Sequence, residues 1–350
     1  MKIAQIAPLI ESVPPKRYGG TERVVSYLTE ELIRQGHDVT LFASGDSVTS
    51  ARLEAVAERA LRLDGACRDP LAWHVTMLQR VARLADTFDI IHFHVDYLHF
   101  PMSQALQLPH VTTLHGRLDL PDHRAVYNAY DQMPLISISN AQREPVPRLN
   151  WLATIYHGLP RQLYRFEPRP SGYLAFIGRI SPEKRVDRAI EIARRAGREL
   201  VIAAKVDAVD RDYFAAEIEP LLTDPGVHYI GEVTDREKGE ILGQAHALLF
   251  PIDWPEPFGL VLIEAMACGT PAVAFRRGSV PEIIDHGRSG FIVDDVDAAV
   301  AAVDGVSGLD RAGCRRMFEN RFSARRMARG YLAAYRRIVD QELESSQLAS

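Results

Sequence analysis

The sequence predicts an α/β protein with two doubly wound parallel sheets that face each other across a cleft. Short apolar segments alternate with helix-like segments from the first residues onward, and such alternation is typical of parallel sheets flanked by helices. The alternation lapses over residues 160–172 and then starts again. A chain of 350 residues is also long enough for two domains, each with its own core.

The first half of the chain supplies one set of alternating elements. Residues 160–172 (PRQLYRFEPRPSG) carry no periodicity and are rich in Pro and Arg, so we expect them to link the domains. Before this linker, strands are expected over 2–8, 38–44, 89–95, 110–115 and 134–139, and helices over about 21–35 and 69–86.

The second half repeats the pattern and ends in a long helix. Strands are expected over 173–179, 199–205, 227–233, 247–252 and 270–275, and helices over 186–195, 235–245, 259–268 and from Pro281. A last helix over about 324–344 places Met327, Tyr331, Leu332, Tyr335 and Ile338 on one face. We therefore expect domains over 1–165 and 166–323, with the last helix packed back on the first domain.

Composition excludes several classes of protein. The net charge of −5 gives no basic excess for nucleic-acid binding. Cys67, Cys268 and Cys314 are far apart and form no C-x-x-C pair, which disfavours a disulfide framework or zinc site and fits a cytoplasmic location. The sequence contains no apolar run long enough for a membrane span. The composition does not exclude transient contact with a lipid surface.

Two familiar phosphate-binding motifs do not occur. Neither G-x-G-x-x-G after the first strand nor a Walker loop is found, which argues against a dinucleotide fold and against P-loop phosphoryl transfer. Gly19 and Gly20 do precede the first helix, where backbone N–H groups can approach a phosphate. A glycine pair alone is more often only a turn.

The segment PEPFGLVLIEAMACGTP (255–271) contains two glutamates eight positions apart. Glu256 precedes the expected helix, where free N–H groups favour an anion, and the Glu264 side chain tilts back toward the same end. This arrangement suits an anionic ligand flanked by two carboxylates that accept hydrogen bonds from hydroxyls. The alternative is structural: Glu256 caps the helix and Glu264 pairs with an arginine, since an unpaired buried carboxylate is costly.

Arg179 and Lys184 follow the first strand of the second half, in GRISPEKR. A loop closed by Pro182 can bring both cations to one anion, the arginine in bidentate fashion. A solvated basic loop is the alternative.

Histidines gather near strand ends in the first half. His115 ends the strand HVTTLH and would face the cleft, although a lone histidine there is usually structural. His92, His94, Asp96 and His99 suggest a metal site, but no second segment offers a completing ligand, so we expect none. We expect His94 or Asp96 to contact an acceptor instead.

A set of motifs together carries a family resemblance. They are Gly19-Gly20-Thr21-Glu22, Gly36-His37, His115, Gly178-Arg179, Glu183-Lys184, the E-x7-E of Glu256 and Glu264 with its trailing AMACGTP, Gly278, Pro281-Glu282 and Gly287 to Gly290. With them the chain resembles the retaining GT-B glycosyltransferases of family four over nearly its whole length. The E-x7-E block is the specific part.

The resemblance implies a role for each matching residue. In similar enzymes, the acid matching Glu264 binds the ribose of a nucleotide sugar and the acid matching Glu256 faces sugar hydroxyls. Arg179 and Lys184 would hold the diphosphate, and His115 would contact the donor sugar. Further donor contacts are expected from Gly19, Gly20, Tyr229, Gly231, Phe258, Gly259 and Leu260, and acceptor contacts from Thr21, Glu22, His94 and Asp96.

The resulting functional prediction is a cytoplasmic, metal-independent, retaining hexosyltransferase without cofactor. Its two Rossmann-like domains would place the acceptor on residues 1–165 and the nucleotide sugar on 166–323. A UDP-sugar is the favoured donor, a GDP-sugar the next, and the acceptor an unidentified hydroxyl in glycan, glycolipid or glycoside synthesis. A related epimerase or phosphorylase and a non-catalytic sugar-nucleotide binder are the alternatives.

The chain also departs from the family pattern at four places. They are Gly116 after the histidine, Arg185 in place of glycine, Ala203-Ala204 in place of a glycine pair, and His157 before Gly158.

Overall fold

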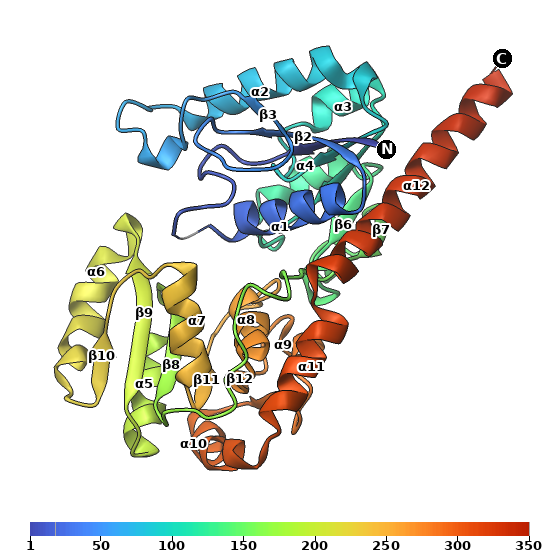
Figure 1. Cartoon of the computed structure of the whole chain (residues 1–350). Helices are drawn as coiled ribbons and strands as arrows, with labels where there is room; N and C mark the ends of the chain where they lie inside the picture. Colours follow the sequence, from blue (N-terminus) through green and yellow to red (C-terminus); the bar gives the residue numbers. More distant parts are fainter. Residues whose placement is uncertain (18, 350) are drawn as a thin grey trace. The chain divides into compact units, whose positions relative to one another are not determined.

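A computed structural model of the protein describes residues 1–17 and 19–349. The chain forms two compact units, shown in Figure 1. Unit 1 consists of Met1–Gly158 with Ala324–Ser350, and unit 2 of Leu159–Ser323. The chain thus leaves unit 1 at Gly158 rather than at 165, and the expected linker belongs to unit 2.

Unit 1 is built on seven parallel strands in the order β3-β2-β1-β4-β5-β6-β7. The strand order reverses between β1 and β4, so the switch point lies where Ile6 and Phe93 end their strands. The strands are β1 Lys2–Ile6, β2 Asp38–Ala43, β3 Arg52–Ala55, β4 Ile90–Phe93, β5 His110–Thr113, β6 Leu135–Ser137 and β7 Trp151–Thr154.

Helices cover the sheet of unit 1, and the last of them returns from unit 2. They are α1 Gly20–Arg34, α2 Pro70–Leu84, α3 Phe100–Leu106, α4 His123–Ala129 and α12 Ala324–Ala349, with short turns η1 Leu61–Leu63, η2 Ala85–Thr87 and η3 Ala141–Arg143. Helix α12 packs on α1 and β4. Its Tyr331 and Tyr335 are fully buried, because they fill the sheet face beneath the helix.

Unit 2 repeats the architecture with six parallel strands in the order β10-β9-β8-β11-β12-β13. Its strand order reverses between β8 and β11. The strands are β8 Leu174–Ile180, β9 Leu200–Val206, β10 Val227–Tyr229, β11 Ala247–Phe250, β12 Ala272–Phe275 and β13 Gly290–Val293. Strand β10 is shorter than expected, since Gly231 turns the chain with a φ of 73°.

The helices of unit 2 follow its strands in order. They are α5 Val186–Arg195, α6 Arg211–Tyr213, α7 Asp235–Gln244, α8 Leu260–Cys268, α9 Val280–Ile283, α10 Val296–Gly305 and α11 Arg311–Arg321. Short 3₁₀ helices are η4 Ala208–Asp210, η6 Glu219–Thr223 and η7 Val306–Gly308, and η5 Phe214–Ile218 is a π-helix. The predicted fold class, two parallel-sheet α/β domains, is confirmed. Among the described residues, no helix is both long and apolar enough to cross a membrane.

Candidate active site

The strand ends at the switch point of unit 2 carry the residues predicted to bind the donor. Strands β8 and β11 are neighbours, so the loops that follow Ile180 and Phe250 leave the same edge of the sheet. Lys184 lies on the first loop and Glu256 on the second. Open parallel sheets bind ligands at this edge, in the crevice where the strand order reverses.

Lys184 and Glu256 form an ion pair, with Nζ of the lysine on Oε2 of the glutamate. The indole N–H of Trp254 donates to the same oxygen at 3.1 Å. The Lys184 ammonium also lies 4.9 Å from the centre of the Trp254 ring and 5.9 Å from that of Phe250. The structure therefore brings together one predicted cation and one predicted acid, in a partly aromatic setting.

The turn after β12 holds the loop that carries Glu256 in place. A side chain at Gly278 would place its Cβ 2.4 Å from the backbone oxygen of Glu256. Ser279 N–H donates to that same oxygen at 3.0 Å, and the Ser279 hydroxyl donates to the carbonyl of Phe258 at 2.9 Å. Gly259 then takes a left-handed φ of 78° and starts α8. The close approach explains why glycine is needed at 278.

Arg179 is surrounded by carboxylates. Its guanidinium lies 2.6 Å from Glu183, and it lies 3.6 Å from both Asp207 and Asp210. Asp207 also pairs with Lys205 at 2.8 Å. The two aspartates follow β9, and their approach to Arg179 depends on the pairing of β9 with β8. A phosphate that bound Arg179 would have to compete with these acids.

Glu264 is almost sealed from water, with 2% of its surface exposed. Its partner is a lysine and not the arginine that the structural alternative required: Lys238 Nζ lies 2.6 Å from Oε1. The hydroxyl of Tyr164 donates to the same oxygen at 3.2 Å, and Lys238 lies 3.2 Å from Asp235. Within the described residues, the other oxygen, Oε2, accepts no hydrogen bond. Sequence reasoning missed Lys238 and Tyr164.

Tyr229 and Gly231 lie at the end of β10, two strands away from β8. The Tyr229 hydroxyl donates to the carbonyl of Ala204 at 3.1 Å. A Cβ at Gly231 would meet nothing within 4 Å, so its surroundings are open.

In unit 1 the predicted glycine pair begins α1. Gly19 caps the helix with a φ of 152°, and a Cβ there would lie 2.7 Å from Pro15. Gly20 and Thr21 are the first helical residues. Glu22 is buried, and this burial raises its pKa to about 7, with the nearby Glu11 adding to the effect. Glu11 itself pairs with Arg62.

The predicted histidines meet at the end of β4 and β5. Nδ1 of His94 lies 2.8 Å from Nε2 of His115, and the His115 ring stacks on His157 with centres 5.3 Å apart. Burial lowers the pKa of His115 to about 3, so the ring is neutral. Both nitrogens of His94 are engaged within the protein. Asp96 is exposed and has a left-handed φ of 50°.

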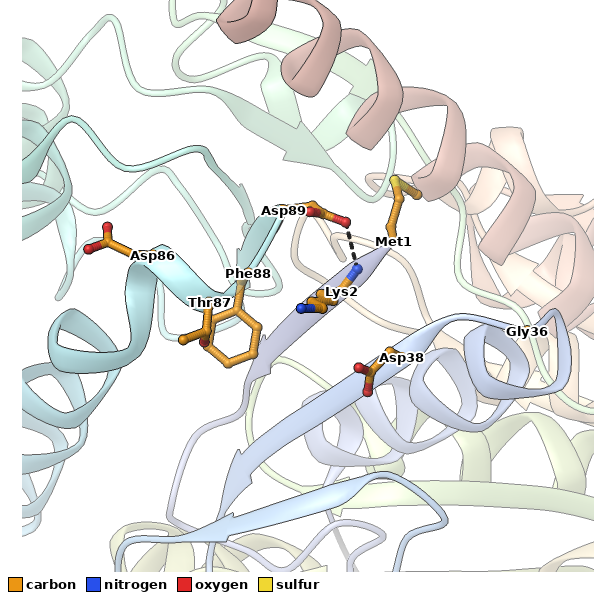
Figure 2. A pocket seen from close by; sticks show the side chains of 8 residues that line it. All are labelled: Met1, Lys2, Gly36, Asp38, Asp86, Thr87, Phe88 and Asp89. Atoms are coloured by element: carbon orange, nitrogen blue, oxygen red, sulfur yellow. Dashed lines mark hydrogen bonds between the residues drawn. The ribbon is translucent and has the colours of Figure 1, made fainter.

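No group of three His, Cys, Asp or Glu side chains suited to a metal ion occurs in the part of the chain that the structure describes. Figure 2 shows a pocket elsewhere, lined by Met1, Lys2, Gly36, Asp38, Asp86, Thr87, Phe88 and Asp89. This pocket lies at the amino ends of β1, β2 and β4. It is thus at the wrong edge of the sheet for the predicted ligand.

Comparison with known families decides the identity of the chain. Residues 165–310 match the family described as glycosyl transferases group 1, and residues 18–154 match glycosyltransferase family 4. The chain is a GT-B glycosyltransferase of the family-four type. The predicted family is thereby confirmed, and the two matches cover most of both units.

Several proteins match this glycosyltransferase over most of both chains. It is 25% identical to the alpha-maltose-1-phosphate synthase of Mycolicibacterium smegmatis, over 95% of this chain and 99% of the relative. AviGT4, a glycosyltransferase involved in avilamycin A biosynthesis, superposes with a TM-score of 0.75 at 24% identity, over 97% and 98% of the two chains. Anabaena HepE in complex with UDP-glucose gives a TM-score of 0.73 at 18% identity, over 99% and 100%.

Proposed function

We propose that this glycosyltransferase is a retaining, metal-independent hexosyltransferase that uses a nucleoside-diphosphate sugar, with a UDP-sugar favoured and a GDP-sugar next. The observation that carries the proposal is the placement of Lys184, Glu256 and the start of α8 at the switch point of unit 2. The complex of HepE with UDP-glucose supports the choice of donor base. The acceptor would be a hydroxyl group of a glycan, glycolipid or small molecule.

Donor binding would exchange ion pairs. Lys184 is paired with Glu256 and Arg179 with three acids, so the diphosphate would take over one or both cations. Transfer of Lys184 to the diphosphate would release the Glu256 carboxylate to accept hydrogen bonds from sugar hydroxyls. Glu264 would accept from the ribose through Oε2, because Oε1 is already held by Lys238 and Tyr164.

In the proposed reaction the bond from the anomeric carbon to the diphosphate oxygen breaks, and the acceptor oxygen bonds to the same face of that carbon. The proton of the acceptor hydroxyl passes to the departing diphosphate. The departing diphosphate develops negative charge, which Lys184, Arg179 and the N-terminus of α8 would stabilise. These groups would supply what a divalent ion supplies in other enzymes, so no metal would be needed. The cytoplasmic location expected from the cysteines is likewise a prediction.

The first test is turnover. The protein would be mixed with UDP-glucose, with GDP-mannose and with a panel of hydroxyl acceptors, each in EDTA, and the product's anomeric configuration read by NMR. Retained configuration without metal supports the proposal. Inverted configuration, or a strict need for a divalent ion, contradicts it.

The same assay separates the alternatives. A product that appears only with inorganic phosphate would indicate a phosphorylase, and an altered sugar on the nucleotide would indicate an epimerase. Tight nucleotide-sugar binding without turnover would indicate a binding protein.

A further inference from the structure

A chain of hydrogen bonds crosses the interior of unit 1, from helix α12 to His115. Gln5 on β1 and Tyr335 on α12 are both 0% exposed, and His94 is 2% exposed. Gln5 Nε2 donates to the Tyr335 hydroxyl at 3.1 Å, and Gln5 Oε1 lies 2.8 Å from Nε2 of His94. Nδ1 of His94 then meets Nε2 of His115 at 2.8 Å.

The direction of each bond follows from Gln5. An amide oxygen can only accept, so Nε2 of His94 carries a proton and Nδ1 of that neutral ring is an acceptor. His115 must therefore donate from Nε2, which leaves a lone pair on its Nδ1. Nδ1 of His115 is buried and has no hydrogen-bond partner among the described residues. This series of hydrogen bonds thus ends at Nδ1 of His115, which is an acceptor.

Further hydrogen bonds fix Tyr335, which lies at the end of this series opposite His115. The Tyr335 oxygen accepts from Gln5, so its own proton is free to go to Nδ1 of His92, 2.6 Å away. Nε2 of His92 then donates to the hydroxyl of Thr113 at 2.7 Å, and Thr113 donates to Tyr331 at 3.0 Å. A single assignment of protons therefore satisfies all of these hydrogen bonds. Burial lowers the pKa of His92 and His94 well below the usual range, so both rings stay neutral.

We propose that Gln5, His94 and Tyr335 are positioning residues that fix His115 as the Nε2–H tautomer and present its Nδ1 as a hydrogen-bond acceptor. The inference rests on the proposed function for its purpose: Nδ1 would accept a hydrogen bond from a hydroxyl group of a substrate. A buried polar chain is costly to keep unless all its members are paired. Within the described part of the chain, Nδ1 of His115, at the end of this series, is an unpaired acceptor that a ligand hydroxyl would satisfy.

Reversing the Gln5 amide would reverse the whole chain. Gln5 would then donate to His94, His94 would donate to His115, and Nδ1 of His115 would carry the proton. The tautomer of His115 therefore tells the two arrangements apart, and it can be measured without any substrate.

The experiment is ¹⁵N NMR of the full chain labelled at the histidine ring nitrogens, with His115 identified by its loss in His115→Asn. The proposal expects wild-type His115 to be protonated at Nε2 and bare at Nδ1. In Tyr335→Phe and in Gln5→Met the constraint is gone, so the two His115 nitrogens should move toward averaged shifts. The Tyr335→Phe variant should also lose about three- to tenfold in kcat, as expected for one misplaced hydrogen bond.

Tyr173→Phe is the matched control, since it removes a hydroxyl that donates to the Ile241 carbonyl at 2.8 Å in unit 2. It should leave the His115 signals unchanged. A wild-type His115 protonated at Nδ1, or unchanged His115 signals in both folded variants, would overturn the proposal. Failure of the wild type to turn over any nucleotide sugar would instead overturn the proposed function and leave the tautomer assignment standing.

Discussion

Lys238 is the residue on which the placement of Glu264 depends most. Its ammonium holds Oε1 of the glutamate at 2.6 Å, and a hydrogen bond to a charged group is among the stronger ones. We expect Lys238→Met to weaken UDP binding about tenfold, measured by calorimetry. Binding of 2′,3′-dideoxy-UDP should not change, because that ligand lacks the ribose hydroxyls that would donate hydrogen bonds to Glu264.

Arg236→Met is the control for this variant, because Arg236 lies on the same helix with its side chain 90% exposed. It should bind both nucleotides like the wild type. Equal losses for UDP and its dideoxy analogue in Lys238→Met would mean that the lysine only stabilises the fold.

Glu22 gives the stability of the protein a dependence on pH. Burial raises its pKa from 4.5 to about 7, so the folded state holds a proton that the unfolded state has already released. Its contribution to stability is present below about pH 4.5 and is lost as pH rises through about 7. Between about pH 4 and pH 8, wild type should lose about 3 kcal/mol relative to Glu22→Gln, measured by urea unfolding.

Glu58→Gln, at an exposed position of the same unit, is the reference for this comparison. Its stability should follow that of the wild type at every pH. Parallel curves for wild type and Glu22→Gln would show that the Glu22 carboxyl is not buried as described.

The turn after β12 determines where the Glu256 loop lies. Gly278→Ala should place a methyl group 2.4 Å from the Glu256 backbone oxygen and push the loop away from Lys184. We expect donor turnover to fall at least about tenfold, with about 2–4 kcal/mol of destabilisation from the clash and the left-handed backbone. Thermal melting and initial rates measure the two effects.

Gly287→Ala separates the effect of backbone strain from the effect of the steric clash at Gly278. Gly287 also has a left-handed φ, 77°, but a Cβ there would meet nothing within 4 Å. This variant should lose only about 1–2 kcal/mol of stability and should keep its turnover. Equal turnover in both alanine variants would contradict the role given to Gly278.

Elements with strong apolar periodicity could be predicted from the sequence, and those without it could not. Helix α5, expected over 186–195, has those bounds in the structure. Strands β3 and β7 were missed because each has only four residues and little of either is buried, so neither shows a clear strand pattern. The seven-residue helices α3 and α4 are too short to show a helical period.

Some residues of the candidate site could likewise be predicted from the sequence, and others could not. The family resemblance assigned Lys184 and Glu256 to one donor site, and the structure brings them together because they follow neighbouring parallel strands. Lys238 could not be predicted, since it lies on a polar helix and reaches Glu264 only through the packing of α7 on α8. Tyr164 comes from the segment expected to be a linker. Contacts made by packing alone leave no signal in a single sequence.

At the scale of the whole molecule, the chain crosses from unit 1 to unit 2 and returns through α12. A chain that stops after Ser323 would lose Tyr331 and Tyr335, both fully buried, and would leave Gln5 and His92 without these hydroxyl partners. We expect unit 1 to become open to proteolysis while unit 2 stays resistant. A chain that stops after Gln341 keeps both tyrosines and should resist proteolysis in both units.

The proposed function depends above all on the binding of a nucleoside diphosphate by unit 2, through Glu264 and without a metal. The most direct test is calorimetric titration of UDP, GDP and ADP in EDTA into the wild type and into Glu264→Ala, with melting curves to confirm that both are folded. We expect one nucleotide, UDP first, to bind the wild type, and we expect the variant to lose at least about tenfold in affinity. Absence of binding by all three, or equal affinity in the folded variant, would contradict it.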